Sequence, residues 1–94
     1  MIKQLVLTLI IHARGINKGS ALCNIGRWED GLEAYAESLK LRPNNGFVWY
    51  RIGNAYKALS EGKKAVEAYN KAVELDPSLS TIVSKEKINF SHRE

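Results

Sequence analysis

The sequence contains too little cysteine and histidine for a disulfide or a typical metal site. Cys23 is the only cysteine among the 94 residues, so no internal disulfide can form and nothing points to an oxidising compartment. The two histidines, His12 and His92, lie near opposite ends of the chain and make no metal-ligand pattern with Cys23. A glycine-rich phosphate loop is also missing. We therefore expect no metal and no cofactor.

Charge of either sign is not concentrated in runs. Lysine and arginine number 14 against 10 aspartates and glutamates, and the resulting net charge of +4 is spread along the chain. A nucleic-acid-binding domain is expected to cluster its basic residues, so we do not expect nucleic acid as a partner. Weak basicity mildly favours acidic partners instead.

Long apolar runs are absent too. The longest, residues 5–11 with one interruption at Thr8, is far short of the ~20 residues that span a bilayer. Lys3 ahead of this run resembles the start of a signal peptide, but no A-x-A-like cleavage site follows. We expect a cytoplasmic chain in which residues 1–11 are an apolar lead-in that packs on the first helix pair, or the eroded end of an earlier unit. A cleaved signal peptide is the alternative.

What the chain does contain is an internal repeat. Residues 35–45 read YAESLKLRPNN, and residues 69–79 read YNKAVELDPSL. The two segments stand at an offset of 34 in the numbering, which we call the repeat period. The same offset pairs Gly19 with Gly53, Ala34 with Ala68, Tyr35 with Tyr69, Leu41 with Leu75 and Pro43 with Pro77. A period of 34 is typical of a helix-turn-helix solenoid.

Apolar residues recur at steps of three and four within each repeat, which predicts two helices per repeat. The predicted helices cover residues 13–25, 29–41, 46–59 and 63–75, and Pro43 and Pro77 follow helix ends. Ser80 is expected to cap a last helix, whose incomplete apolar face consists of Leu79, Ile82, Val83 and Phe90. The expected organisation is an apolar lead-in over 1–11, a degenerate repeat over 12–45, a second repeat over 46–79, and a capping helix with a frayed tail over 80–94.

The second repeat resembles the tetratricopeptide repeat family. The residues at its signature positions are Trp49, Ile52, Gly53, Tyr56, Ala65, Tyr69, Ala72 and Pro77. The resemblance implies an all-α fold in which antiparallel helix pairs stack as a short right-handed superhelical solenoid. The first repeat departs from the pattern at Gly15, Lys18, Gly31 and Ser38. Its glycines predict a weaker helix pair, since each costs about 1 kcal/mol relative to alanine inside a helix.

Catalytic constellations are not evident. His12 and Cys23, eleven positions apart, would lie ~16 Å apart along one helix, too far for a nucleophile and its base. Four carboxylates have spacings typical of a solvated outer helix face: Glu29, Asp30, Glu33 and Glu37. We therefore expect no enzymatic activity.

The resemblance also implies a concave groove, lined by the first helix of each pair, which holds an extended peptide or a partner's helix. The candidate groove residues are Asn17, Ser20, Asn24, Phe47, Tyr50, Arg51, Asn54 and Lys57. Those of the second repeat form a stripe that we expect on the side away from Trp49 and Tyr56. Arg51 and Lys57 suit a partner with acidic or carboxylate groups. Some family members grip acidic C-termini with a carboxylate clamp, which is not supported here because Ile16 and Ser20 occupy its first two positions.

The expected function is a non-catalytic protein–protein interaction module that binds a peptide or helix of a partner protein. The alternative is a fragment or subunit of a longer repeat protein or enzyme complex, which acts through self-association or docking. Two helix pairs and a cap are fewer than the three repeats that independent stability usually needs, so self-association is also expected.

Overall fold

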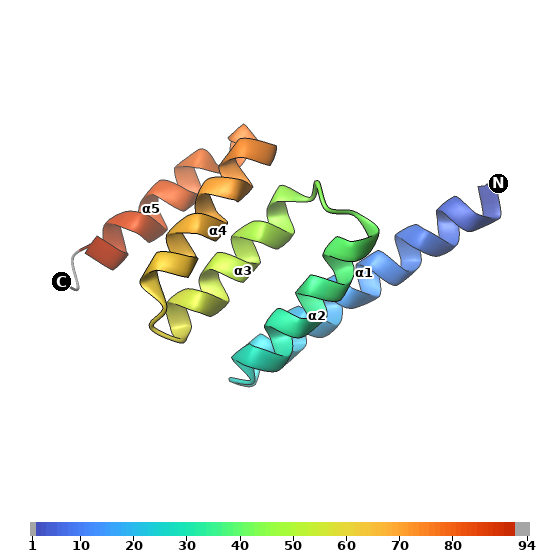
Figure 1. Cartoon of the computed structure of the whole chain (residues 1–94), viewed down its shortest axis with the longest axis horizontal. Coiled ribbons are helices and arrows are strands. Elements are labelled where there is room, and N and C mark those ends of the chain that lie inside the picture. Colours follow the sequence, from blue (N-terminus) through green and yellow to red (C-terminus); the bar gives the residue numbers. More distant parts are fainter. Residues whose placement is uncertain (1, 92–94) are drawn as a thin grey trace. The chain divides into compact units, whose positions relative to one another are not determined.

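The computed structural model describes the backbone of residues 2–91 and the side chains of residues 2–85 (Figure 1). Every regular element in this part of the chain is a helix, which confirms the all-α prediction. The elements are α1 (Ile2–Asn24), α2 (Trp28–Leu41), α3 (Gly46–Ala58), α4 (Gly62–Leu75), the 3-10 turn η1 (Pro77–Leu79) and α5 (Ser80–Ser91). The expected contribution of Phe90 and the expected fraying at residues 92–94 lie outside the described residues.

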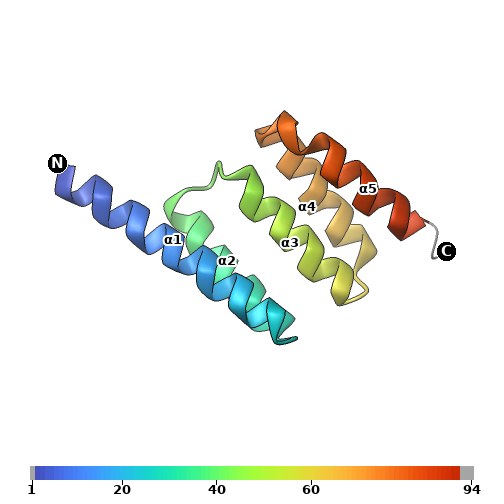
Figure 2. The ribbon, with the colours of Figure 1, turned by 180° about the vertical axis from the view of Figure 1, so that it is seen from behind.

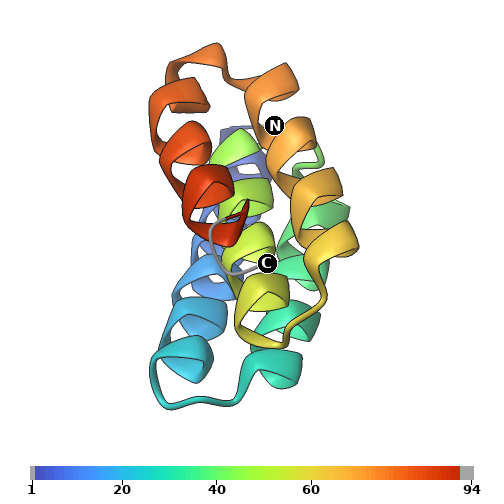
Figure 3. The same cartoon turned by 90° about the vertical axis from the view of Figure 1, so that its left-hand side faces the viewer.

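The chain divides into two compact units. Unit 1, Met1–Asn44, contains α1 and α2, and unit 2, Asn45–Glu94, contains α3, α4 and α5. Within unit 1, α2 folds back along α1, and within unit 2, α4 folds back along α3 (Figures 1 and 2). Figure 3 shows α4 and α5 side by side in unit 2. The antiparallel helix pairs predicted from the repeat are therefore present.

The turns inside the two helix pairs are equivalent. Gly26 and Ser60, one repeat period apart, both adopt positive φ angles, of 84° and 62°. In each turn the next backbone N–H donates to the carbonyl five positions earlier, at 2.8 Å to Leu22 and 2.9 Å to Tyr56. This hydrogen bond closes a Schellman motif, in which glycine is favoured because it has no Cβ. Ser60 adopts the same backbone conformation at some cost in strain.

Short polar side chains cap the starts of α3 and η1 in unit 2. The Asn45 carboxamide oxygen accepts from the backbone N–H groups of Phe47 at 3.1 Å and Val48 at 3.4 Å, and so caps α3. Pro77 follows the end of α4 as expected, but it also begins η1. There the Asp76 carboxylate accepts the backbone N–H of the second residue of η1. The second proline therefore both stops α4 and starts the turn into α5.

The core of unit 2 is built around a fully buried tyrosine. Tyr69 is 0% exposed and belongs to a cluster with Ala65, Ala72, Leu79 and Val83. The last two of these come from η1 and α5, so α5 covers the end of this core. The start of α5 also follows the start of α3 by one repeat period, which is the sequence position of the first helix of a third repeat.

Glycines allow the helices of both pairs to approach closely. A Cβ added at Gly53 would lie 2.5 Å from Cε1 of Tyr69, and one at Gly19 would lie 2.6 Å from Cε1 of Tyr35. Gly31 in turn leaves room for the Cys23 sulfur. The glycines that predict weak helices in unit 1 therefore contribute to its packing.

Ser38 replaces the alanine usual in the family because it pairs with a buried histidine. Nδ1 of His12 lies 2.8 Å from the Ser38 hydroxyl oxygen and 3.0 Å from the Ser38 carbonyl oxygen, and both residues are buried. A buried imidazole needs such partners, since an unpaired polar group in a core costs stability. The departure from the family pattern at Ser38 therefore satisfies His12.

The first helix begins earlier than predicted. α1 starts at Ile2, not at residue 13, and residues 2–11 are its N-terminal half. The expectation that this apolar segment is a separate lead-in packed on the first helix pair is wrong, because it continues α1 and its large apolar side chains are exposed. The physical reason lies in the repeat itself. Pro43 and Pro77 follow the ends of α2 and α4, the second helices of the two pairs. Leu9 stands one repeat period before Pro43, and since leucine does not stop a helix, the helix continues through this position. No helix in the described part of the chain combines the length and apolarity needed to cross a membrane.

Candidate partner-binding face

The exposed face of α3 carries a row of rings with a cation beside it. The ring centroids of Phe47 and Tyr50 are 6.3 Å apart, and those of Tyr50 and Tyr69 are 6.0 Å apart. The Arg51 guanidinium lies 4.9 Å from the centroid of the Phe47 ring. Residues three and four apart on a helix are neighbours, so this contact follows from the sequence spacing. The row leads from Phe47, 41% exposed, to the buried Tyr69.

Arg51 is the residue of this face whose hydrogen bonding is least satisfied. Its Nε is buried and has no hydrogen-bond partner among the described residues. Arginine stays charged and has only donors, so a buried unpaired Nε favours an acceptor supplied from outside. A carboxylate or a backbone carbonyl is the group that a guanidinium binds best. The role of Arg51 in partner binding stays a prediction.

Two other predicted residues also belong to the scaffold. The Asn54 side-chain oxygen accepts the Tyr69 hydroxyl at 2.6 Å, which leaves the amide NH₂ as its group for a ligand. Tyr50 packs against the same core cluster as Trp49 and Tyr56. The expected separation of the stripe from these aromatic residues is therefore incomplete.

We predict that Asn54→Ala lowers the stability of unit 2. It removes the acceptor of a hydroxyl on a residue that is 0% exposed, and an unsatisfied buried donor costs about 1–3 kcal/mol. Urea unfolding followed by circular dichroism measures the loss. Lys63→Ala, at an exposed position of α4, is the control and should change little. An equal effect of the two substitutions would contradict the role assigned to Asn54.

Unit 1 repeats this pairing. Ser20 stands one repeat period before Asn54, and its hydroxyl lies 3.0 Å from the Tyr35 hydroxyl. Asn17 and Asn24 are exposed on α1, and Lys57 is half-buried near the end of α3. The structure thus brings together Phe47, Tyr50 and Arg51, while Asn17, Ser20 and Asn24 belong to the other unit.

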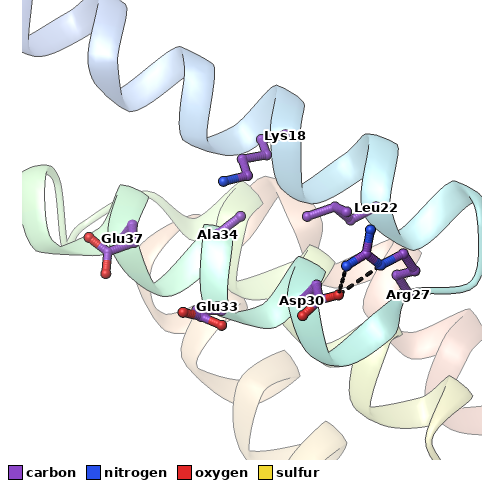
Figure 4. A pocket seen from close by; sticks show the side chains of 7 residues that line it. All are labelled: Lys18, Leu22, Arg27, Asp30, Glu33, Ala34 and Glu37. Atoms are coloured by element: carbon purple, nitrogen blue, oxygen red, sulfur yellow. Dashed lines mark hydrogen bonds and ion pairs between the residues drawn. The ribbon is translucent and has the colours of Figure 1, made fainter.

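A shallow hollow in unit 1 was not predicted, because its walls come from two helices. It encloses about 300 Å³ and is lined by Lys18, Leu22, Arg27, Asp30, Glu33, Ala34 and Glu37 (Figure 4). Arg27 forms an ion pair with Asp30 at 2.6 Å. Among the described residues, no group of three or more histidines, cysteines and carboxylates could hold a metal ion. The hollow is therefore an open, charged surface between α1 and α2.

Helix pairs that close on glycine and alanine, repeated at a constant period, define an α-helical repeat protein. Residues 47–79 match the family model described as tetratricopeptide repeat. The chain is therefore a tetratricopeptide repeat protein, as the resemblance implied.

Similar proteins align with most of the chain. Small glutamine-rich tetratricopeptide repeat-containing protein 2 of Mycosarcoma maydis is 31% identical over 80 residues, which cover 80% of this chain and 23% of that protein. The Hsp70-Hsp90 organizing protein of Triticum aestivum is 33% identical over 67 residues, which cover 71% of this chain and 12% of the relative. The solved structure of MamA MSR-1 C2 has a TM-score of 0.69 and 31% identity over 71% of this chain and 38% of that one. The chain thus spans less than a quarter of these two curated relatives.

Proposed function

We propose that this chain is a non-catalytic interaction module that binds a peptide or helix of a partner protein along α3. The tetratricopeptide repeat relatives support this assignment, since one of them is an Hsp70-Hsp90 organizing protein and another a peroxisomal targeting signal receptor. We also propose that the chain acts in the cytoplasm, that residues 12–45 and 46–79 are its two repeats, and that residues 80–94 are the cap.

The observation that carries the proposal is the unpaired Nε of Arg51 beside the exposed ring of Phe47. An acidic side chain or C-terminal carboxylate would satisfy the guanidinium, and an adjacent apolar side chain would cover the ring. Lys57 adds positive charge further along the helix. Asn17, Ser20 and Asn24 are the candidate contacts of unit 1, with Ser20 limited by its contact to Tyr35.

We predict that Arg51→Ala/Lys57→Ala reduces partner binding at least about tenfold, since a hydrogen bond to a charged group contributes about 1.5–3 kcal/mol. Quantitative affinity capture identifies the partner, and titration calorimetry with its peptide gives the dissociation constant. Lys63→Ala/Lys71→Ala removes the same charge from exposed positions of α4 and should leave binding unchanged. Equal binding by both double variants would refute the α3 face. Asn54 is left intact because its loss would also disturb Tyr69.

Self-association, or docking within a longer repeat array, is a second candidate. The specific observation is that α5 has the sequence position of a first helix, and a second copy could supply the helix that packs on it. Sedimentation velocity over a range of concentrations tests this function, which fails if the chain remains monomeric.

A further inference from the structure

The N-terminal half of α1 extends past the end of α2 (Figures 1 and 2). α1 has 23 residues, whereas α2 has 14. Seven large apolar side chains in residues 2–11 are 43–79% exposed, and they are Ile2, Leu5, Val6, Leu7, Leu9, Ile10 and Ile11. Water-exposed apolar patches of this kind usually mark an interaction surface.

Helical spacing sorts this part of α1 into three faces. At 3.6 residues per turn, one arc of about 140° holds Ile2, Leu5, Val6, Leu9 and Ile10, which we call the apolar arc. The side toward α2 carries the buried His12 and Gly19. The third face carries Lys3, Arg14 and Lys18, which fall within about 60° of one another at one edge of the apolar arc.

We call these three cations the basic stripe. It is not visible as a run of charge in the sequence, because Lys3 and Arg14 stand eleven positions apart. All three are exposed, and α1 contains no acidic residue. Within the described residues, no carboxylate forms an ion pair with Lys3, Arg14 or Lys18. Lys18 contributes the least positive potential of the three, since Glu33 and Glu37 line the same hollow.

An apolar groove lies directly beside the basic stripe. It has a volume of about 420 Å³, and apolar Ile11 and Leu41 contribute to its lining. The charged side chains of the lining are three cations and one carboxylate: Arg14, Lys18, Lys40 and Glu37, of which Glu37 forms an ion pair with Lys40. Cationic groups next to exposed apolar side chains suit a ligand with an anionic head and an apolar body.

A second copy of the chain fits the apolar arc poorly. Packing one α1 on another would bring the cations of both helices together without any acidic residue on either helix. The outer face of α2 is acidic, but Leu41 is its only large apolar side chain that is exposed.

We propose that the N-terminal half of α1 docks the chain on an anionic phospholipid surface. The apolar arc enters the acyl boundary, while the basic stripe at its edge contacts the lipid phosphates, as in helices that lie in the membrane interface. Ten helical residues are ~15 Å long, half of the ~30 Å of a hydrocarbon core, so the helix lies on the bilayer and does not span it. The residues of this surface differ from those of the α3 face proposed for protein partners.

Vesicle flotation of the full chain tests the proposal. We expect capture by phosphatidylcholine vesicles that contain phosphatidylserine, and much weaker capture by phosphatidylcholine alone. Lys3→Gln/Arg14→Gln should lower the partition coefficient about thirtyfold, from the contribution of two cations near an anionic surface. Lys63→Gln/Lys71→Gln makes the same charge change on α4 and should bind like the unmodified chain.

A second pair of substitutions tests the apolar arc. Leu5→Gln/Leu9→Gln should abolish capture by both vesicle types and leave the circular dichroism spectrum unchanged, because both side chains are exposed and glutamine is a good helix former. Capture that survives this change would overturn the proposal, as would no capture of the unmodified chain. In the latter case, dimerisation without vesicles that Leu5→Gln/Leu9→Gln abolishes would assign the arc to a second copy. A monomer would assign it to a protein partner.

Discussion

Tyr69→Ala is expected to lower the free energy of unfolding of unit 2 by about 4 kcal/mol, the typical cost of removing a large buried aromatic ring. Tyr69 is 0% exposed and belongs to a buried cluster to which α3, α4 and α5 all contribute residues. The substitution therefore leaves a cavity where three helices meet. It also removes the Tyr69 hydroxyl, which donates a hydrogen bond to the Asn54 side-chain oxygen. Urea unfolding followed by circular dichroism gives the difference in free energy.

Tyr69→Phe is the matched control. It keeps the ring and removes only the hydroxyl, so we expect a loss of about 1 kcal/mol. A loss for Tyr69→Ala close to that of Tyr69→Phe would mean that the ring does not organise the core.

Gly53→Ala is expected to destabilise unit 2 by about 2 kcal/mol, although alanine is the better helix former by about 1 kcal/mol. The new Cβ would lie 2.5 Å from Cε1 and 2.6 Å from Cδ1 of Tyr69. Neither the ring nor α3 can move without disturbing buried neighbours, because the ring is fully enclosed. Steric overlap therefore outweighs helix propensity at this position.

A double-mutant cycle separates the two effects. In the Tyr69→Ala background the overlap is gone, so Gly53→Ala should become neutral or stabilise the protein by up to about 1 kcal/mol. The same cost of Gly53→Ala in both backgrounds would show that the ring is not the reason for glycine at this position. The equivalent pair in unit 1, Gly19 and Tyr35, should behave in the same way.

The repeat made the helices and their close contacts predictable. A tyrosine, a small residue and a proline recur at the repeat period, and the structure places the tyrosine and the small residue in equivalent contacts in both units. Helix ends were predictable where Gly26, Pro43 and Pro77 lie. The start of α1 was not predictable, because the only clue is the lack of a proline at position 9, one repeat period before Pro43. The comparison of Leu9 with Pro43 is informative only if the repeat period is applied to residues before the first predicted repeat, which begins at residue 12.

The candidate site was only partly predictable. The spacing of Phe47 and Arg51 places them on neighbouring turns, and the Arg51 guanidinium lies over the Phe47 ring. Spacing alone could not show that Asn54 is engaged by a hydroxyl from α4, since that contact depends on how two helices cross. Ser38 is a similar case, because its departure from alanine is explained only by the buried His12.

The continuity of α1 has a mechanical consequence. A tetratricopeptide unit joined to a surface anchor by a flexible linker could rotate freely about that linker. Here the N-terminal half of α1 and the half that packs on α2 are one continuous helix. Any contact made by that end therefore sets the tilt and rotation of the whole helix pair. The leucine concerned is Leu9, which stands one repeat period before Pro43. Because the helix continues through Leu9, a contact at the N-terminus of α1 is transmitted to the helix pair through continuous helical backbone.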